Sequence, residues 1–395
     1  MKLAVITNIL APYRIPLFAA LQRRVERLHV LLMAESEENR SWNLPPCSFE
    51  YEVLPGLHLR LPGADVSLHI NHGVMRQLRE FAPDVVLSGG FTPANLSAWL
   101  YCRLTRRAFV AWGELTLQEP AAARSLLRRS VRRLLISQSD GAIASSSDAR
   151  DAFAHYGLSP TAILTSIMPI DVQYFHSRSV ACRAAAGFKL ERAQYAPPIL
   201  LSVGRMSAGK GYQELFAIYE AVLGQRPVSL LLVGDGPQRA EYEAYVRSRG
   251  WSQVHFVGFR QADDVARFLA LADVFVFHTL HDKFGAVLSE AMAAELPVVS
   301  SIHACATRDL VEDGVTGFRI DPRDIAASTR TLLEVLAMSA SERSAVGTAA
   351  YHKVRQYNLE LTAERMIEFM VSLLGRGTQQ SAPAQRLPGN SGGSP

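Results

Sequence analysis

The sequence predicts an α/β protein with two Rossmann-like domains, each built around a parallel sheet. Its 395 residues, 48% of them hydrophobic, are enough for two packed cores. Short apolar segments alternate with amphipathic ones, which is typical of parallel strands joined by helices. This alternation occurs twice, before and after Ala196-Pro197-Pro198. We therefore expect a first domain over residues 1–178, a linker over 179–198 and a second domain over 199–356.

The first domain should begin with a buried strand and continue as helices and strands in turn. Expected strands cover residues 3–7, 30–33, 85–87, 109–112 and 142–144, and expected helices cover 13–24, 74–81, 94–104, 121–136 and 147–155. The segment 39–61, rich in proline and aromatic residues, predicts a loop or short-strand insertion. Residues 8–14 follow the first strand and should therefore face the cleft of a doubly wound sheet.

The second domain should begin with a strand at Ile199. Its further strands are expected near residues 230, 254, 274, 298 and 317–320, and helical sequence covers 359–374. Residues 376–395 are rich in Gly, Ser, Pro and Gln, a composition that predicts disorder.

Two carboxylates mark a loop-to-helix junction in the second domain. Asp282 lies in the loop after a strand, and Glu290 lies about two turns into a helix expected to begin near Phe284. The amides of Phe284, Gly285 and Ala286 would then occupy the first helical turn, where backbone donors lack internal partners and the dipole favours anions. This combination suits a polyhydroxylated, anionic ligand.

Two basic residues stand in another strand-to-helix loop. A buried strand ends near Arg205 and a helix opens after Gly211, so Arg205 and Lys210 are presented together. Two cations in this arrangement suit the binding of a diphosphate. Gly209 and Gly211 let the backbone approach a ligand closely.

These motifs resemble those of retaining glycosyltransferases of family 4, within glycosyl transferases group 1. The carboxylates stand where that family has Glu-x7-Glu, with Asp282 in place of the first glutamate, and Glu-Ala-Met-Ala and Leu-Pro-Val-Val follow. Residues 230–237 and 254–259 match two further strand-and-turn segments, the second of which lies beside the nucleobase in the family. Four motifs in the same order make the resemblance specific.

The resemblance implies the GT-B fold, in which two Rossmann-like domains face each other across a cleft. A terminal helix, here 357–375, would cross back onto the first domain. The implied reaction is a retaining, metal-independent transfer of a sugar from a UDP- or GDP-sugar to a hydroxyl of a glycan or lipid-linked acceptor. Bacterial surface polysaccharide, lipopolysaccharide or glycoconjugate biosynthesis would be its setting. No Asp-x-Asp occurs in the chain, and no metal or cofactor is expected beside the nucleotide-sugar.

The resemblance also implies roles for individual residues. Arg205 and Lys210 would hold the diphosphate, Glu290 the ribose hydroxyls and Asp282 the donor sugar. Glu114, in Trp112-Gly113-Glu114 where relatives often carry a histidine, would accept a hydrogen bond from a sugar hydroxyl or cap the segment that follows. The predicted catalytic residues are Glu114, Arg205, Lys210, Asp282 and Glu290. The predicted donor-binding residues are Gly204, Arg205, Lys210, Gly258, Phe259, Phe284, Gly285, Ala286, Val287 and Glu290.

Other polar residues have two interpretations. Arg14 either contacts the donor or acceptor or is solvated at the start of a helix. Asp148 and Arg150, after three serines, are better explained by helix capping. His278 is expected to be structural rather than catalytic, and so is His281 beside Asp282.

Arginines are concentrated in the segment 121–135, although the net charge is only +4. They are Arg124, Arg128, Arg129, Arg132 and Arg133. Leucines supply the other side of the expected helix, so the segment either lies on an anionic membrane surface or presents a solvated face. Nucleic acid is disfavoured because no aromatic residues are interleaved with the arginines.

Two compositional features bear on location and redox state. No apolar run reaches the roughly 18–20 residues of a membrane span, and the amino terminus predicts a strand rather than a signal peptide. A cytoplasmic protein is expected, peripheral at the inner face of the plasma membrane if the basic helix binds lipid. Cys47, Cys102, Cys182 and Cys305 are widely spaced, which indicates neither a zinc site nor a disulfide framework.

Two rival functions remain at this point. A sugar-nucleotide epimerase of the same fold would act on the donor alone. An inactive relative would bind a nucleotide or glycan without releasing sugar, an alternative suggested by Asp282 and by the missing histidine.

Overall fold

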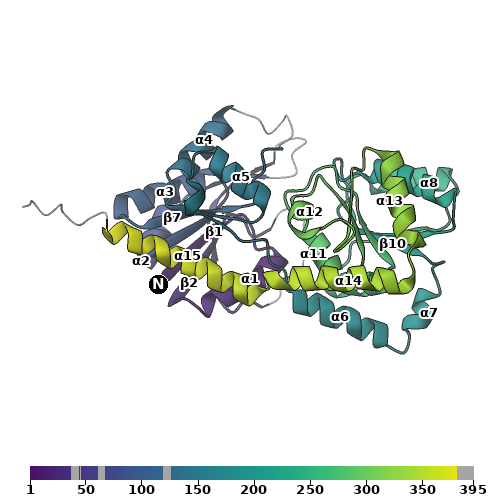
Figure 1. The fold of residues 1–395 in the computed structure, drawn as a ribbon. Coiled ribbons are helices and arrows are strands. Elements are labelled where there is room, and N and C mark those ends of the chain that lie inside the picture. Colours follow the sequence, from purple (N-terminus) through teal and green to yellow (C-terminus); the bar gives the residue numbers. More distant parts are fainter. Residues whose placement is uncertain (37–43, 45, 61–66, 119–125, 380–395) are drawn as a thin grey trace, which may run out of the picture.

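The computed structural model describes residues 1–36, 44, 46–60, 67–118 and 126–379. Two parallel sheets, each covered by helices, lie side by side along the long direction of the molecule (Figure 1). The predicted α/β fold with two parallel sheets is confirmed. Among the helices in the described ranges, none combines the length and the apolar composition that a membrane span requires.

The first sheet has seven strands in the order β3-β2-β1-β6-β7-β8-β9, and all neighbours are parallel. Except for the edge strand β3, its strands are largely apolar because both faces of a parallel sheet are buried. They are β1 (Lys2–Thr7), β2 (Arg27–Leu32), β3 (Glu50–Val53), β6 (Val85–Gly89), β7 (Ala108–Gly113), β8 (Gly141–Ala144) and β9 (Ile163–Thr165). β4 (Gly56–Arg60) and β5 (Ser67–Asn71) form a separate antiparallel hairpin, so the predicted insertion 39–61 contains β3 and β4, while residues 39–43, 45 and 61 lie outside the described residues.

Helices cover both faces of this sheet. The short 3-10 helix Pro12–Arg14 and α1 (Ile15–Gln22) replace the single helix predicted over 13–24. α2 (Val74–Phe81), α3 (Pro93–Thr105), α4 (Leu126–Ser137) and α5 (Ser147–His155) follow. Apolar residues of α1 and of the terminal helix pack on one face with Leu3 and Val5, whereas α2 and α3 pack on the other with Ala4 and Ile6. Alternate residues of β1 therefore serve opposite layers.

The second sheet has six parallel strands in the order β12-β11-β10-β13-β14-β15. The strands are β10 (Ile199–Val203), β11 (Ser229–Val233), β12 (Val254–Gly258), β13 (Val274–Phe277), β14 (Val298–Ser301) and β15 (Phe318–Ile320). The helices are α8 (Tyr212–Leu223), α9 (Arg239–Ser248), α10 (Ala262–Leu271), α11 (Ala286–Ala293), α12 (Cys305–Leu310), α13 (Ile325–Ala337) and α14 (Ala340–Val354). Strand order reverses between β10 and β13, and ligands of doubly wound sheets bind at such a point.

Two connections join the units. Residues of the first connection, including Ile167 and Ile170, pack in the same core as β10 and β13, so by packing the second unit begins before the boundary predicted at 178. The predicted linker contains the end of α6 (Val172–Ala184) and all of α7 (Phe188–Arg192), and α6 packs on α10 and α11.

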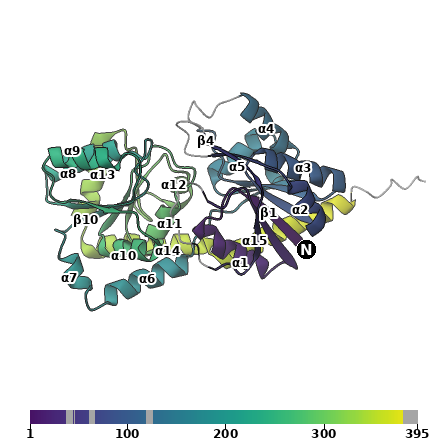
Figure 2. The ribbon, with the colours of Figure 1, turned by 180° about the vertical axis from the view of Figure 1, so that it is seen from behind.

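The second connection leads into α15 (Leu359–Gln379), which crosses the first unit on the near side in Figure 1 and on the far side in Figure 2. Its Ala363, Met366, Met370 and Leu373 are buried in the core of the first sheet. The helix extends into the tail predicted over 376–395, of which residues 380–395 lie outside the described part of the chain.

Candidate functional site

The loop between β10 and α8 carries the predicted basic residues and is held against the end of β13. Gly211, at φ +75°, packs so closely that a Cβ atom there would lie 2.1 Å from the His278 carbonyl oxygen. The Gly209 carbonyl accepts a hydrogen bond from the Leu280 amide at 3.0 Å. This close approach of two loops, which only glycine permits, fixes where Lys210 emerges.

His278 lies beneath this loop. Its ring is buried, and its Nε2 is 2.9 Å from the Ser202 hydroxyl. Burial lowers the pKa of His278 to about 4, so the ring is neutral near pH 7. A buried neutral ring that supports a loop fits the structural role expected for this histidine.

Lys210 and Asp282 are brought together by the two loops. The Lys210 Nζ lies 2.5 Å from Asp282 Oδ2, and both side chains are partly exposed. The backbone of Asp282 is bonded on both sides: its amide donates to the His303 carbonyl at 3.1 Å, and its carbonyl accepts from the Cys305 amide at 3.2 Å. Sequence reasoning assigned the two side chains to different parts of a donor, whereas here they form an ion pair with each other.

The start of α11 differs from the prediction. The helix begins at Ala286 with Gly285 as its N-cap at φ +94°, so Phe284 precedes the helix. The Phe284 amide is directed at Asp282 Oδ1, 3.3 Å away, instead of standing free in a first turn. A Cβ at position 285 would lie 2.5 Å from the Phe277 ring, which explains the glycine. The first-turn donors of the helix are therefore those of Ala286 and Val287, both half-buried.

Glu290 is the fifth residue of α11, closer to the helix start than the two turns predicted. Desolvation by burial raises the pKa of Glu290 to about 7. A carboxyl group with this pKa exchanges its proton near neutral pH and is a candidate ligand-binding group.

We expect the stability of the ligand-free protein to depend on pH through Glu290. Its pKa is higher in the folded chain, about 7, than the ordinary value of 4.5, so the folded state holds more protons between these values. The free energy of unfolding should fall as pH rises from about 4.5 to 7, by at most about 3 kcal/mol. In thermal unfolding across this range, the melting temperature of Glu290→Gln should rise relative to that of the wild type as pH rises.

The matched control is Glu241→Gln, an exposed glutamate on α9. The difference in melting temperature between Glu241→Gln and the wild type should stay constant over the same pH range. Parallel pH curves for the wild type and Glu290→Gln would contradict the burial argument.

The remaining predicted donor-binding residues lie at the carboxyl ends of β10 and β12. Gly204 follows β10 and its amide donates to the Val233 carbonyl at 2.9 Å. Arg205 follows it in the same loop. Gly258 ends β12 and Phe259 follows it, and the Phe259 residue is 38% exposed. An exposed aromatic ring at this edge offers a stacking surface.

The opposite unit contributes a small pocket at the ends of β7, β8 and β9. Arg14 is its main polar group: it donates to Thr7 Oγ1 at 2.6 Å and to Glu114 Oε1 at 3.2 Å. Its guanidinium also lies over the Trp112 ring, 4.7 Å from the centroid. Contact with Tyr13 and Glu114 raises the pKa of Arg14 despite burial, which by itself would lower it. Arg14 is therefore not solvated, and it holds the Glu114 carboxylate in place.

The pocket is closed by Met168 of the first connection and by Met366 of α15. Its lining includes Tyr13, Glu114, Ser145, Met168 and Met366. Sequence reasoning named Glu114 but missed its pairing with Arg14, because the two are 100 positions apart.

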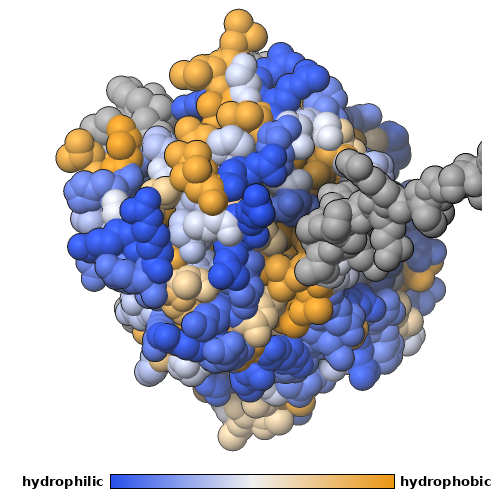
Figure 3. Space-filling view, turned by 90° about the vertical axis from the view of Figure 1, so that its left-hand side faces the viewer, coloured by the Kyte–Doolittle hydropathy of each residue, from blue (hydrophilic) through white to orange (hydrophobic). Residues whose placement is uncertain are grey.

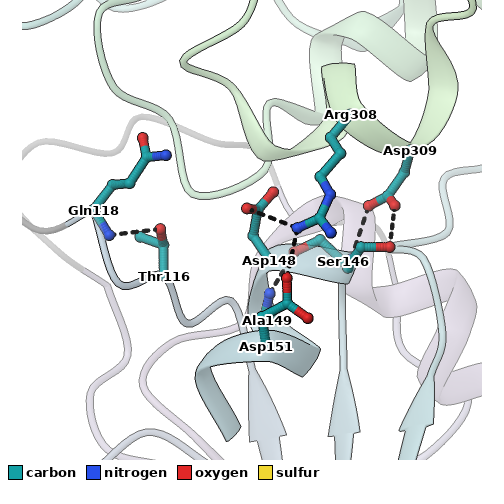
Figure 4. A network of polar contacts seen from close by, with 9 residues as sticks. Thr116, Gln118, Ser146, Asp148, Ala149, Asp151, Arg308 and Asp309 are labelled. Carbon is teal, nitrogen blue, oxygen red and sulfur yellow. Dashed lines mark hydrogen bonds and ion pairs between the residues drawn. The ribbon is translucent and has the colours of Figure 1, made fainter. Parts of the chain in front are cut away.

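A polar contact network bridges the two units (Figure 4). Asp309 of α12 accepts hydrogen bonds from the amide and the hydroxyl of Ser147 at 2.9 and 2.5 Å. Arg308 points from the second unit to Asp148 and Asp151 of α5, at 3.2 and 2.7 Å. We call these contacts the inter-unit clasp.

The clasp corrects the capping prediction for Asp148 and Arg150. Ser146 is the N-cap of α5 and accepts from the Ala149 amide at 3.0 Å. Asp148 pairs with Arg308 of the other unit, and the Arg150 guanidinium donates to Thr165 Oγ1 at 3.4 Å. A serine cap leaves the acidic first turn of α5 available to the other unit.

Breaking the clasp should favour an open arrangement of the two units. The Arg308 pairs are about half exposed, so each contributes little, and Asp309 adds a contact at a helix N-terminus. Together their loss in Arg308→Ala/Asp309→Ala should shift the open-to-closed ratio by roughly fivefold to thirtyfold. Small-angle X-ray scattering would detect this change as a larger radius of gyration.

Arg267→Ala is the control for this variant, since its ion pair with Glu191 lies wholly within the second unit. It should leave the scattering curve unchanged. If the clasp variant also scatters like the wild type, the clasp does not hold the units together.

Comparisons with solved structures define the class of fold. The chain is similar to Anabaena HepE in complex with UDP and glucose, with a TM-score of 0.70 and 20% identity over 94% of this chain and 100% of that one. It is also similar to the apo form of the lipopolysaccharide outer core galactosyltransferase WaaB, with a TM-score of 0.69 and 16% identity over 94% and 99%. The fold is that of the GT-B glycosyltransferases.

The match to a family model lies in the second unit. Residues 189–353 match the model described as "Glycosyl transferases group 1". The lipopolysaccharide core biosynthesis glycosyltransferase LpsE of Rhizobium meliloti is 29% identical over 176 residues, covering 44% of this chain and 50% of that protein. A GDP-mannose-dependent alpha-mannosyltransferase of Mycobacterium tuberculosis is 28% identical over 216 residues, covering 54% and 52%. The matched segments span about half the length of these relatives.

Proposed function

We propose that the protein is a glycosyltransferase that moves a sugar from a nucleotide-sugar donor to a hydroxyl of a glycan or lipid-linked acceptor in polysaccharide biosynthesis. The observation that carries this proposal is the meeting of Lys210 and Asp282 at the point where the strand order of the second sheet reverses. The match of residues 189–353 to group 1 glycosyl transferases supports it. So does the presence of UDP and glucose in the HepE structure.

The donor would lie across the loops of the second unit. Its diphosphate would meet Arg205 and Lys210, its ribose hydroxyls would donate to Glu290, and its nucleobase would lie beside Phe259. A bound diphosphate would share the Lys210 ammonium with Asp282. Asp282 would thereby position the lysine as well as meet the donor sugar. The amides of Ala286 and Val287 would complete the sugar site.

The proposed transfer is retaining and needs no metal. The bond between the anomeric carbon and the leaving phosphate oxygen breaks as the acceptor oxygen bonds to that carbon on the same face. The leaving phosphate takes the acceptor's proton, and Arg205 and Lys210 stabilise the charge that develops on it. Glu114, held by Arg14, would accept a hydrogen bond from a sugar hydroxyl on the opposite side of the cleft. Closure of the two units would limit hydrolysis of the donor.

A donor screen followed by product analysis tests the proposal. Thermal-shift measurements with uridine, guanosine and adenosine nucleotide sugars would identify the base of the donor. We propose that such donors reach the protein in the cytoplasm. Mass spectrometry and chromatography with candidate acceptors would then find the product. Transfer supports the glycosyltransferase. An isomerised donor without acceptor would identify an epimerase, and binding without sugar release would identify an inactive relative.

A further inference from the structure

Two helices on one face of the first sheet present leucines to solvent. In α3, Leu96, Leu100 and Leu104 recur every four residues and are 37%, 45% and 66% exposed. In α4, Leu126 and Leu127 are 78% and 74% exposed. Residues four apart lie on one side of a helix, so the α3 leucines form a single stripe.

The two helices are neighbours. They follow the adjacent strands β6 and β7, and both pack on the same face of the sheet, on which Phe109 and Ala111 lie. The Arg103 guanidinium of α3 donates to Gln138, just after α4, at 3.3 Å. Figure 3 shows this end of the molecule, with hydrophobic residues gathered at the top, where Figure 1 places α4. The two helices therefore lie on the same side of the first unit.

We call this side the α3–α4 face. Its members are exposed leucines and arginines of the two helices, namely Leu96, Leu100, Leu104, Leu126, Leu127, Arg128, Arg129 and Arg133.

The charge on this face has one sign. α4 contains four arginines and α3 contains one, and neither helix contains an aspartate or glutamate. In the part of the chain that the structure describes, Arg128, Arg129 and Arg133 form no ion pair. The Arg132 guanidinium lies over the Phe91 ring, 5.8 Å from its centroid. Arg124 lies outside the described residues.

Leucines beside unpaired arginines complement an anionic bilayer. The leucines would enter the boundary between headgroups and acyl chains, and the guanidinium groups would pair with lipid phosphates. A solvated helix face would carry the arginines but would not need the leucine stripe of a second helix. Soluble proteins seldom leave contiguous apolar surface exposed without a partner.

We propose that the α3–α4 face docks the protein on an anionic lipid bilayer. The inference rests on the proposed function in one respect, because docking would bring the cleft to a lipid-linked acceptor. Its test does not depend on catalysis, since lipid binding is measured without donor or acceptor.

The test is sedimentation of the full chain with vesicles of phosphatidylcholine containing about one third phosphatidylglycerol. The wild type should bind these vesicles, bind phosphatidylcholine alone weakly, and release as salt rises from about 0.1 to 0.5 M. Arg128→Gln/Arg129→Gln should weaken binding at least about tenfold and reduce the salt dependence. Leu100→Ser/Leu104→Ser should weaken binding as well, which a basic α4 acting alone does not predict.

Controls on other surfaces keep the test specific. Leu190→Ser removes a leucine of α7 that is 77% exposed, and Arg247→Gln removes an arginine of α9 whose side chain is 70% exposed. Both should bind vesicles like the wild type. Thermal unfolding and nucleotide binding of all variants should be unchanged, which separates failure of docking from failure of the proposed function.

Three outcomes would overturn the proposal. The first is a wild type that does not bind anionic vesicles. The second is unchanged binding by both the arginine and the leucine variants. The third is light scattering that shows a dimer lost on Leu126→Ser/Leu127→Ser, because the face would then join two copies of the chain.

Discussion

Replacing Lys210 with alanine should lower the rate of sugar transfer by about 10²–10³-fold. The Lys210 Nζ lies 2.5 Å from the Asp282 carboxylate, at the point where the strand order of the second sheet reverses. Without it, the leaving diphosphate loses a positive charge and Asp282 loses its partner. Turnover of the donor identified by the screen, followed by chromatography of the released nucleotide, measures this effect.

Lys189→Ala is the matched control, because Lys189 is an exposed lysine on α7 in the same unit. It should transfer sugar at the wild-type rate. The melting temperature of Lys210→Ala should stay close to that of the wild type, since the Lys210 side chain is partly exposed. Near-native turnover by a folded Lys210→Ala protein would contradict the role of Lys210 in stabilising the leaving diphosphate.

Gly211→Ala should damage both the stability of the second unit and donor binding. The backbone at this position has φ +75°, and the added Cβ would lie 2.1 Å from the His278 carbonyl oxygen. Either the loop or the end of β13 must move, and we expect the free energy of unfolding to fall by about 2–4 kcal/mol. Chemical denaturation measures the loss, and nucleotide titration measures the displacement of Lys210 and Arg205.

Gly209→Ala separates backbone strain from steric conflict. Gly209 also has a positive φ, +86°, but an added Cβ would meet no atom within 4 Å. Gly209→Ala should lower the free energy of unfolding by only about 1–2 kcal/mol, the cost of placing alanine in a left-handed backbone conformation. Equal losses for the two variants would show that the contact with His278 is unimportant.

Much of the fold could be predicted because parallel strands buried on both faces leave a clear apolar pattern. The strand at Ile199 and the helices at 74–81 and 147–155 were predicted where the structure has them. The start of α11 was missed by two residues because Gly285 adopts a left-handed cap, which a hydrophobic pattern does not encode.

For the candidate site, the sequence predicted individual residues and their close neighbours in the chain, but not the contacts between distant segments. Lys210 and Asp282 were both named, but their pairing depends on two loops that meet through Gly211. The clasp was missed because Asp309 and Ser147 are 162 positions apart and serine and aspartate are common on loops. Contacts between the units depend on how the whole chain is arranged, which local patterns do not contain.

The two connections between the units restrict how they can move. The chain passes from the first unit to the second between Thr165 and Val172, and returns between Tyr357 and Leu359. Two short tethers prevent sliding or full separation, so the remaining freedom is rotation about a line through both tethers. In Figure 1, α5 and α12 lie above the junction of α14 and α15, so rotation about the tethers would separate Arg308 and Asp309 from α5. Separation of the two units is therefore governed by a few contacts between α5 and α12, while both hydrophobic cores stay intact.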